Sequence, residues 1–586
     1  MKISGTECSV LQWVCLATLC QPATSLPSQA PRDSLERFVA AANSAAARQS
    51  WREAAAAWRK VTILNPYSGT FHFSLAGAAL NAGDTATAIG ALRRFVEVGG
   101  LSPTESATTA FVQSPAAIAY QVAQLYGLQN QVDSALSWLS TALRLGFRGR
   151  AGILRDAAFE KFRADARLKA LAGQFRLERG TRTDKWRADL AFVLQELERQ
   201  HPAPFRRTPR SRFVADMDGL IREVPSLNDD QVAVRVQCLL RSVGDGHTGI
   251  LTEGVPGWSS ALPLQFESFG DALYVTAADS QYESLVGARV LALESHPIDR
   301  VLSLLDSIAS RDNDFGVLRN RSRHLRYFRV LRGLGLLRDT TRVRFEIERR
   351  DGIRSTVTVT PKPPPNGYSR AWGAPSWVTL SGPTTPETPL WLRNRERPYW
   401  FEDVPSQHFA YFGFNLVTNA ADVAFGPFVD GMFAYIESHS VDRLVIDLRW
   451  NNGGNTQLLP VLIQSLIRSR VNRNGRLFVL TSRYTYSAAM NAATLLEQNT
   501  NAIVIGEPTP SSPNFVGESN PIVTPNTGIP FSISNVDWQT SWPFDRRKWI
   551  APRILVPLSL SALRGRDDPA IAAALSYDPS LARPVP

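Results

Sequence analysis

Hydrophobic positions return with a helical period through the first third of the chain. Between residues 34 and 175 alanine is abundant, and larger apolar side chains recur every three or four positions. Ala88 follows Ala54 at the same spacing as Leu92 follows Trp58. The spacing equals the period of about 34 residues that is typical of stacked helix pairs, in which small residues allow close packing between layers. The pattern predicts a helical repeat region, with a generic helical bundle as the alternative.

The helical pattern continues from residue 183 to residue 255 and includes a distinctive loop. Asn228 is a predicted helix start, and apolar residues follow it up to Leu240. Residues 244–248 then read Gly-Asp-Gly-His-Thr. Because glycines favour tight turns, His247 is expected to project from a loop of this helical cap.

Strand-like alternation replaces the helical pattern between residues 260 and 362. Val343, Phe345 and Ile347 alternate with charged residues, and Asp351-Gly352 supplies a hairpin turn before a return strand. This part of the chain is predicted to form a small β-domain.

Apolar strands alternate with helices between residues 390 and 580. The run 441–449 is a predicted strand, and further apolar runs occur at 477–480 and 502–505. The stretch 422–438 carries large apolar residues at helical spacing. Such alternation is typical of an α/β core with a largely parallel sheet. The whole chain is therefore expected to be a multidomain α plus α/β protein.

Composition and charge limit the range of partners. The 586 residues are 44% hydrophobic, which suffices for several buried cores. The net charge of +11 is spread along the chain, and its densest arginine segment, 319–332, also has apolar residues at helical spacing. That pattern predicts the solvated face of an amphipathic helix. No base-stacking or groove-reading module accompanies the arginines, so nucleic acid is not an expected partner.

The N-terminal segment, residues 1–25, resembles a secretory signal. Lys2 precedes an apolar run at 10–19, and small residues stand at 23–25. The run is too short to span a membrane. Export to the periplasm or the medium is therefore expected, with a buried first helix as the alternative.

Cysteine and histidine positions give no sign of a metal site. Three of the four cysteines lie in the N-terminal segment, which leaves Cys238 alone in the rest of the chain. The seven histidines form no cluster with ligand spacing. No metal, no cofactor and no disulfide framework is expected.

Ser487 marks the candidate chemistry. It lies between a predicted strand and an alanine-rich helix, and the earlier turn 450–455 contains Gly453 and Gly454. A serine so placed can act as a nucleophile, while backbone N–H groups of Ala488 and the glycines form an oxyanion hole. The alternative is that the serine only caps the helix.

Three motifs, in this order, resemble those of the tail-specific, or C-terminal processing, serine peptidases. They are Asp-Leu-Arg-Trp-Asn-Asn-Gly-Gly at 447–454, Thr-Tyr-Ser-Ala-Ala at 485–489 and Gly-Glu-Pro-Thr at 506–509. The resemblance covers about residues 185–577 and implies a ββα-spiral core related to the crotonase and caseinolytic peptidase folds, with Ser487 as nucleophile. The β-domain resembles a PDZ-type module that takes a peptide as an added strand, with a purely structural β-domain as the alternative. The helical region before it resembles tetratricopeptide repeats.

The family activates its serine in two ways, and the sequence distinguishes them. One branch has a lysine shortly after the third motif, where this chain reads Pro-Ser-Ser-Pro at 510–513, and Lys548 is the only lysine after Ser487. The other branch, that of the tricorn core peptidase, uses a histidine supplied by the helical cap, and His247 matches that position. The ordinary pKa of imidazole suits a base at neutral pH.

A histidine base needs a partner for its second ring nitrogen. In the tricorn branch a serine precedes the histidine and connects it to a distant carboxylate, whereas this chain has Gly246 there. Glu518 is the first candidate carboxylate, Asp545 the second and Asp245 the third.

The residues and the resemblance together predict an exported serine endopeptidase that acts through an acyl-enzyme on peptide or protein substrates. The alternative is a non-catalytic ligand- or peptide-binding protein, since retinoid-binding proteins use the same core without peptidase activity. The helical repeats are a candidate site for a protein partner. The expected domains are a signal peptide (1–25), helical repeats (34–175), a cap that carries His247 (183–255), a β-domain (260–362) and a catalytic core (390–580).

Overall fold

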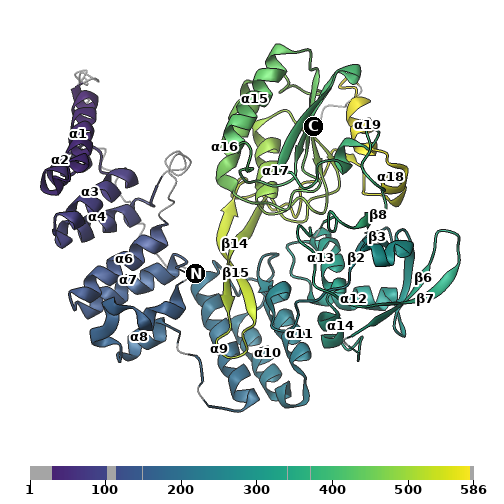
Figure 1. The fold of residues 1–586 in the computed structure, drawn as a ribbon, viewed down its shortest axis with the longest axis horizontal. Coiled ribbons are helices and arrows are strands. Elements are labelled where there is room, and N and C mark those ends of the chain that lie inside the picture. The colour runs from purple at the N-terminus through teal and green to yellow at the C-terminus, as the bar shows by residue number, and fades with distance from the viewer. Residues whose placement is uncertain are drawn as a thin grey trace, which may run out of the picture. The chain divides into compact units, whose positions relative to one another are not determined.

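The computed structural model describes residues 30–101, 114–147, 149–173, 175–177, 179–339, 341–369 and 371–580. The expected signal peptide lies outside these ranges. Within them, no helix is both long enough and apolar enough to cross a membrane. The chain divides into two compact units (Figure 1). The first is formed by residues 1–147 and 155–162, and the second by residues 148–154 and 163–586.

The first unit is built from helix hairpins. Its helices are α1 (Ala30–Ala47), α2 (Trp51–Leu64), α3 (Gly69–Asn81), α4 (Thr85–Glu97), α6 (Pro115–Leu128) and α7 (Val132–Arg144). The residues related by the repeat spacing, Ala54 with Ala88 and Trp58 with Leu92, are all buried in the second helices of two successive hairpins. The predicted helix pairs are confirmed, and their assignment to the tetratricopeptide class stays a prediction.

A helical cap follows the short helix α8 (Ala166–Leu171) in the second unit. It contains α9 (Arg182–Gln200), α10 (Arg210–Glu223) and α11 (Asp229–Arg241). Helix α11 begins as predicted, because the side chains of Asn228 and Gln231 each accept a hydrogen bond from the other's backbone N–H. This reciprocal capping satisfies donors that a helix start leaves free. The loop with His247 follows the end of α11.

The β-domain contains the predicted hairpin. An antiparallel sheet has the order β2 (Leu264–Phe269), β3 (Ala272–Ala278), β4 (Arg289–Leu293), β6 (Val343–Glu348) and β7 (Arg354–Val359), with β5 (His296–Pro297) beside β4 and β8 (Val378–Thr379) beside β3. Helices α12 (Ile298–Ile308), α13 (Asp314–Arg326) and α14 (Phe328–Gly333) connect β5 to β6. Hairpin β6–β7 matches the predicted alternation, and the PDZ type of this domain stays a prediction.

The arginine-rich segment 319–332 is not the solvated helix face that its pattern predicted. It spans two helices, and Arg326 is fully buried, with Nε donating to a backbone carbonyl beside β2 at 3.1 Å. Arg329 and Arg332 pair with Asp230, a buried carboxylate of α11. The prediction fails because these arginines connect the β-domain to the cap, and periodicity alone does not show such contacts.

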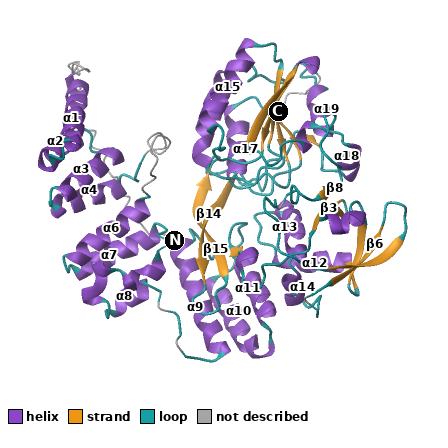
Figure 2. Cartoon of the chain, in the orientation of Figure 1, coloured by secondary structure: helices purple, strands orange, loops and turns teal. Residues whose placement is uncertain are grey.

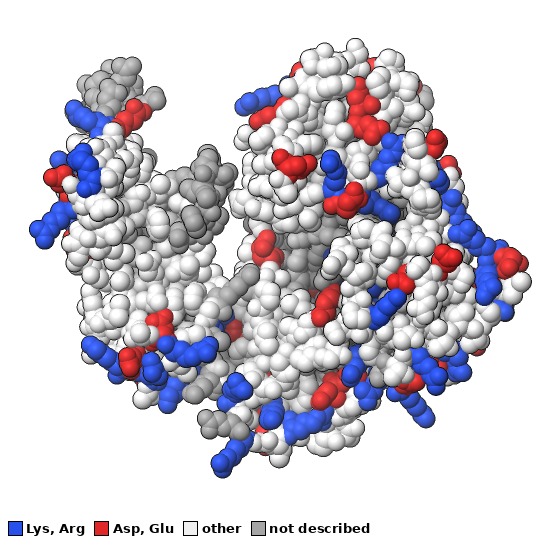
Figure 3. Space-filling view, in the orientation of Figure 1, with Lys and Arg blue, Asp and Glu red and all other residues white. Residues whose placement is uncertain are grey.

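The excess of positive charge is dispersed over the surface. On the face drawn in Figure 3, basic and acidic side chains of the described residues are interspersed. Several arginines form ion pairs, among them Arg321 with Asp306 at 2.6 Å and Arg323 with Glu253 at 2.9 Å. The net charge therefore does not by itself identify a surface for a polyanion.

The core has the largely parallel sheet that the sequence predicted. Its order is β16 (Ile554–Leu555), β13 (Ile503–Gly506), β12 (Leu477–Thr481), β11 (Arg443–Asp447), β10 (Phe409–Phe414) and β9 (Tyr399–Val404), and only β9 runs antiparallel to its neighbour. Alternate strand residues face opposite sides. Ile446 and Val479 pack with α15 (Phe425–Ser438), α16 (Leu459–Arg468) and α17 (Ala488–Asn499), whereas Val445 and Phe478 pack with α19 (Pro569–Leu575) (Figure 2). The short helix α18 (Leu560–Gly565) precedes α19, and the ββα-spiral class stays a prediction.

A long hairpin, which the sequence did not predict, joins the core to the cap. Strands β14 (Asn514–Val523) and β15 (Pro530–Gln539) extend from the core alongside α9 (Figure 1). Strand β1 (Gly249–Ile250), which begins two residues after His247, pairs with β15 in antiparallel register. Phe531 and Ile533 of β15 belong to the same apolar cluster as the cap helices. The hairpin therefore fixes where the histidine loop lies on the core.

One buried carboxylate of the cap holds the hairpin tip. Asp189 of α9, 1% exposed, accepts hydrogen bonds from the backbone N–H groups of Asn526 and Thr527 at 3.0 and 2.8 Å. It also accepts one from each of their side chains at 2.7 Å. Four donors thus converge on one carboxylate, and the two backbone N–H groups would lack a protein acceptor if it were removed.

Asp189→Ala is expected to loosen the hairpin by about 3 kcal/mol, because buried donors left without acceptors cost about 1–3 kcal/mol each. Amide hydrogen exchange of residues 514–539, followed by mass spectrometry, measures the change. Asp218→Ala removes an exposed carboxylate of α10 and is the matched control. Equal exchange in the two variants would show that the tip does not depend on Asp189.

Candidate active site

Ser487 occupies a strained turn between β12 and α17. Its φ is 57° and its ψ is −123°, a conformation that non-glycine residues rarely adopt. It stands at the N-cap position of α17, yet its side chain forms no capping hydrogen bond. The half-buried hydroxyl makes no hydrogen bond with any described residue. Simple helix capping therefore does not explain this serine.

The turn that carries the glycines is packed directly beneath Ser487. The backbone N–H of Tyr486 donates to the carbonyl of Asn451 at 3.0 Å, and Thr485 Oγ1 donates to the carbonyl of Leu448 at 2.9 Å. A Cβ at Gly453 would lie only 2.6 Å from the Cβ of Ser487, and the φ of this glycine is 111°. Only glycine fits there without moving the serine.

Two backbone N–H groups beside Ser487 are available to an oxyanion. Ala488 is the first residue of α17, so its N–H has no acceptor within the helix. The N–H of Gly453 already donates to Asn451 Oδ1 at 2.9 Å. The N–H of Gly454 has no such acceptor among the described residues, because the neighbouring bridge to Val417 uses the groups on either side of it. Of the three residues predicted for the oxyanion hole, Gly454 and Ala488 have a free donor.

His247 lies against Tyr486, the residue that precedes Ser487. Its Nδ1 is 2.9 Å from the hydroxyl of Tyr486, and the two rings are stacked with centroids 4.5 Å apart. Phe515 of β14 lies parallel to the imidazole at 5.8 Å. The other ring nitrogen, Nε2, is buried and has no hydrogen-bond partner among the described residues. The structure therefore brings His247 and the serine turn together and leaves one imidazole nitrogen unused.

Burial changes the acidity of the imidazole. It lowers the pKa of His247 to about 4, and the positive charge of Arg319 acts in the same direction, while the charge of Asp245 opposes it. Arg319 lies over the Tyr486 ring with Cζ 3.9 Å from its centroid. The histidine is consequently neutral at neutral pH.

Asp245 holds the histidine loop and does not touch the imidazole nitrogens. Its carboxylate accepts from the backbone N–H groups of His247 and Thr248 at 2.8 and 2.7 Å, from Ser534 Oγ at 2.6 Å and from His201 at 3.0 Å. Burial raises the pKa of Asp245, but these hydrogen bonds outweigh it and lower the net value. The third carboxylate candidate therefore stabilises its own turn.

Glu518 and Asp545 are not hydrogen-bonded to His247 in this structure. Glu518 is exposed on β14 and has a φ of 47°. Asp545 pairs with Arg547 at 2.8 Å and accepts from Ser541 at 2.6 Å, and these partners lower its pKa strongly. Sequence alone ranked these two carboxylates first because it gives no measure of exposure or of competing partners.

Asp312, in the loop between α12 and α13, is the carboxylate that sequence reasoning missed. It accepts from the backbone N–H of Gly246 at 3.1 Å and from Ser511 Oγ at 2.7 Å. Burial raises the pKa of Asp312 to about 7, and the nearby charge of Asp245 adds to the effect. A cavity of about 160 Å³ adjoins this cluster, and Phe515 is part of its wall. No motif marks Asp312 itself, although its two partners, Gly246 and Ser511, lie in segments that the resemblance singled out.

The charged residues of the motifs around the turn are tied into buried ion pairs. Arg449 joins Asp447 at 2.6 Å and Asp568 at 2.8 Å. Arg483 joins Glu507 at 2.5 Å and Glu267 of β2 at 2.9 Å. These groups position the backbone on either side of Ser487, and none of them contacts its hydroxyl.

Comparisons with known proteins return proteases. Mature CPAF complexed with lactacystin has a TM-score of 0.49 and 13% identity, over 68% of this chain and 99% of that one. The photosystem II D1 C-terminal processing protease gives 0.34 and 12%, over 64% and 93%. The tricorn protease gives 0.31 and 13%, over 68% and 37%.

No family model and no curated protein sequence matches the chain. The structural neighbours include a C-terminal processing protease and the tricorn protease, which are the kinds of protein that the motifs resemble. At such low identities and TM-scores, the function has to rest on the geometry of this chain's own site.

Proposed function

We propose that the chain is a serine peptidase in which Ser487 attacks the carbonyl carbon of a peptide bond and forms an acyl-enzyme. The backbone of Ser487 supports this most directly. Its positive φ costs about 1–3 kcal/mol, and the backbone N–H groups of Gly454 and Ala488 have no acceptor among the described residues. A strained turn of this kind also presents the nucleophile in other hydrolases.

His247 is the proposed general base. As Ser487 Oγ bonds to the carbonyl carbon, its proton passes to Nε2 and the carbonyl electron pair moves to oxygen, where the N–H groups of Gly454 and Ala488 donate. The C–N bond then breaks as Nε2 returns the proton to the leaving amine. Water, deprotonated by the same nitrogen, hydrolyses the ester and restores Ser487.

Tyr486 is the proposed orienting partner of the base. Nε2 can accept a proton only if the ring hydrogen is on Nδ1 and is donated to the Tyr486 oxygen. Burial and the charge of Asp312 raise the pKa of the Tyr486 hydroxyl well above its ordinary value, so the phenol stays neutral. This arrangement takes the place of the carboxylates that the sequence predicted, Glu518 and Asp545.

The substrate and the setting are proposed from the same features. Acyl transfer through this site suits peptides or proteins. The cavity beside Asp312 supports an approach to the site from the cap side. We infer an endopeptidase, exported as the N-terminal segment suggests, with the helix hairpins of the first unit available to a protein partner. The alternative, a binding protein without catalysis, is supported by the lack of a hydrogen bond between Ser487 and His247 in this structure.

A fluorophosphonate probe separates the two functions, because it reacts covalently only with an activated serine. The wild type is expected to be labelled, Ser487→Ala to remain unlabelled, and Ser438→Ala, which changes an exposed serine of α15, to be labelled as wild type. Equal labelling of wild type and Ser487→Ala, or no labelling at all, would exclude the peptidase.

The pH dependence of kcat/KM tests the base. Only neutral His247 can take the proton, so kcat/KM should fall as pH decreases through a value near its lowered pKa, about 4, and not near 6.5. His247→Ala should lower kcat by about 10²–10⁴-fold, whereas His439→Ala, at an exposed position, should leave it unchanged. An acidic limb near 6.5 that His247→Ala does not affect would show that another group is the base. Recovery of activity after return to neutral pH controls for acid unfolding.

Tyr486→Phe keeps the stacked ring and removes its hydroxyl. The loss of a hydrogen bond worth about 1–3 kcal/mol to the imidazolium should reduce kcat by about ten- to a hundredfold and leave KM unchanged. The acidic limb should move to lower pH, because imidazolium loses an acceptor. Tyr435→Phe, which removes a hydroxyl of α15 that donates to Asp403 of β9, is the control. An unchanged limb and kcat would remove Tyr486 from the mechanism.

A further inference from the structure

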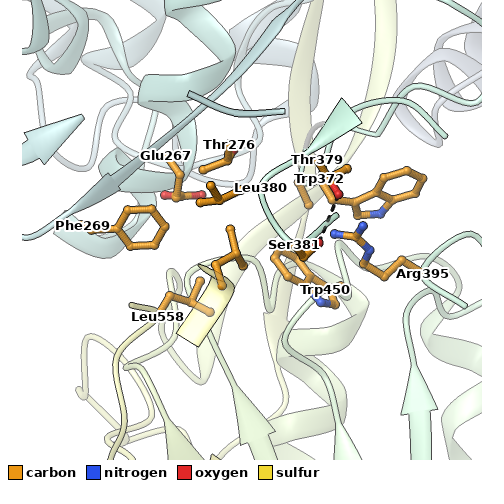
Figure 4. A pocket seen from close by; sticks show the side chains of 12 residues that line it. Glu267, Phe269, Thr276, Trp372, Thr379, Leu380, Ser381, Arg395, Trp450 and Leu558 are labelled. Atoms are coloured by element: carbon orange, nitrogen blue, oxygen red, sulfur yellow. Dashed lines mark hydrogen bonds between the residues drawn. The ribbon is translucent and has the colours of Figure 1, made fainter. Parts of the chain in front are cut away.

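A small cavity lies where the β-domain meets the turn that carries the oxyanion glycines (Figure 4). Its volume is about 30 Å³. Phe269 and Leu380 contribute apolar surface from the β-domain, and Leu558 and Leu563 contribute it from the C-terminal part of the chain. A space of this size holds about two water molecules, or a small ion of similar size such as acetate.

Arg395 brings a positive charge without a protein partner to this cavity. Its guanidinium lies between Trp372 and Trp450, with Cζ 5.2 and 6.0 Å from the two ring centroids (Figure 4). It makes no hydrogen bond or ion pair with any described residue. Burial lowers the pKa of Arg395 to about 10. Arg395 is half-buried, and its five guanidinium N–H donors have no protein acceptor among the described residues.

The other polar groups of the lining are already engaged. Glu267 is the only carboxylate among the lining residues, and it accepts from Arg483 at 2.9 Å and from the hydroxyl of Tyr484. The hydroxyls of Thr379 and Ser381 are hydrogen-bonded to each other at 3.1 Å. Acceptors for the free guanidinium therefore have to come from outside the chain.

We propose that this cavity binds the carboxylate of a small organic acid, held by Arg395 between the two tryptophan rings. The planar guanidinium donates two parallel hydrogen bonds to a carboxylate, a geometry that other cations do not offer. The volume admits the carboxylate head, and the apolar lining suits a short hydrocarbon part such as the methyl group of acetate.

A ligand in this cavity would contact Trp450 of the glycine turn and Glu267, which binds residues that precede Ser487. Trp450 is the first residue of the turn that contains the oxyanion glycines, and its Nε1 donates to the carbonyl of Trp391 at 2.8 Å. Glu267 holds Arg483 and Tyr484, which closely precede Ser487 in the chain. The bound acid should stiffen this turn, and the binding itself does not depend on peptidase activity.

Saturation-transfer NMR with acetate, on the full chain at constant ionic strength, tests the site. We expect a saturable signal from the acetate methyl group, and about tenfold or more weaker binding in Arg395→Gln, because a charge-assisted bidentate pair is lost. Arg397→Gln removes the same charge from an exposed neighbour that lies near Asp422, and it should bind as wild type. Equal signals in wild type and Arg395→Gln, or none in wild type, would mean that the cavity holds only water.

Three further measurements test the binding geometry, the coupling to the turn and the source of the acid. Arg395→Lys preserves the charge but not the planar fork, so it should bind more weakly than wild type, and binding at full strength would overturn the bidentate geometry. Amide exchange of residues 450–455 should slow with acetate in wild type and not in Arg395→Gln, and unchanged exchange with acetate bound would overturn the coupling to the turn.

An N-acetyl amino acid that displaces acetate, when its amide does not, would support the site and identify a chain terminus as the source. If neither the N-acetyl amino acid nor its amide displaces bound acetate, the result would support the site and identify a free small acid as the ligand.

Discussion

The pairing of β1 with β15 decides whether His247 lies beside the turn that carries Ser487. His247 precedes Ser487 by nearly half the length of the chain and belongs to a different domain. Strand β1 begins two residues after the histidine, and Ser532 of β15 donates to the His247 carbonyl at 2.6 Å. Ser534 ties the same strand to Asp245. Because β15 continues from the core, the site is complete only when the cap is docked on this hairpin.

Docking also determines how basic the histidine is. The neighbouring rings of Tyr486 and Phe515 cover part of the imidazole, and burial lowers its pKa. The lowered pKa makes His247 a weaker acceptor for the serine proton. Its Nε2, however, has no hydrogen bond to a described residue that must break before it accepts the proton. The charge of Asp245 favours the imidazolium that forms during attack, and Arg319 opposes it. In the proposed reaction, the basicity of the imidazole therefore depends on the balance of these two charges around a half-buried ring.

Local patterns predicted most of the fold and half of the site. The strands β11 to β13 and the start of α11 followed from periodicity and capping, which depend on neighbouring residues. The β14–β15 hairpin and the buried Arg326 were missed because they depend on contacts between distant segments. Residue type and motif order made Ser487, His247 and the glycines candidates, and the fold leaves the free N–H on Gly454 rather than on Gly453. The carboxylate near His247 is Asp312 and not Glu518 or Asp545. Glu518 is exposed and Asp545 is paired with Arg547, and a sequence shows neither property.

The strained backbone of Ser487 explains why buried arginines lie near it, which their contribution to stability does not. Ion pairs such as Arg449 with Asp447, or Arg483 with Glu267, lose much of their Coulomb attraction to desolvation, and apolar replacements are often as stable. Both arginines, however, hold segments that adjoin the serine turn through several hydrogen bonds of fixed direction. A turn with an unfavourable φ relaxes unless its surroundings over-determine it. We therefore interpret these pairs as fixing the geometry of the turn, which apolar side chains of equal volume would not do.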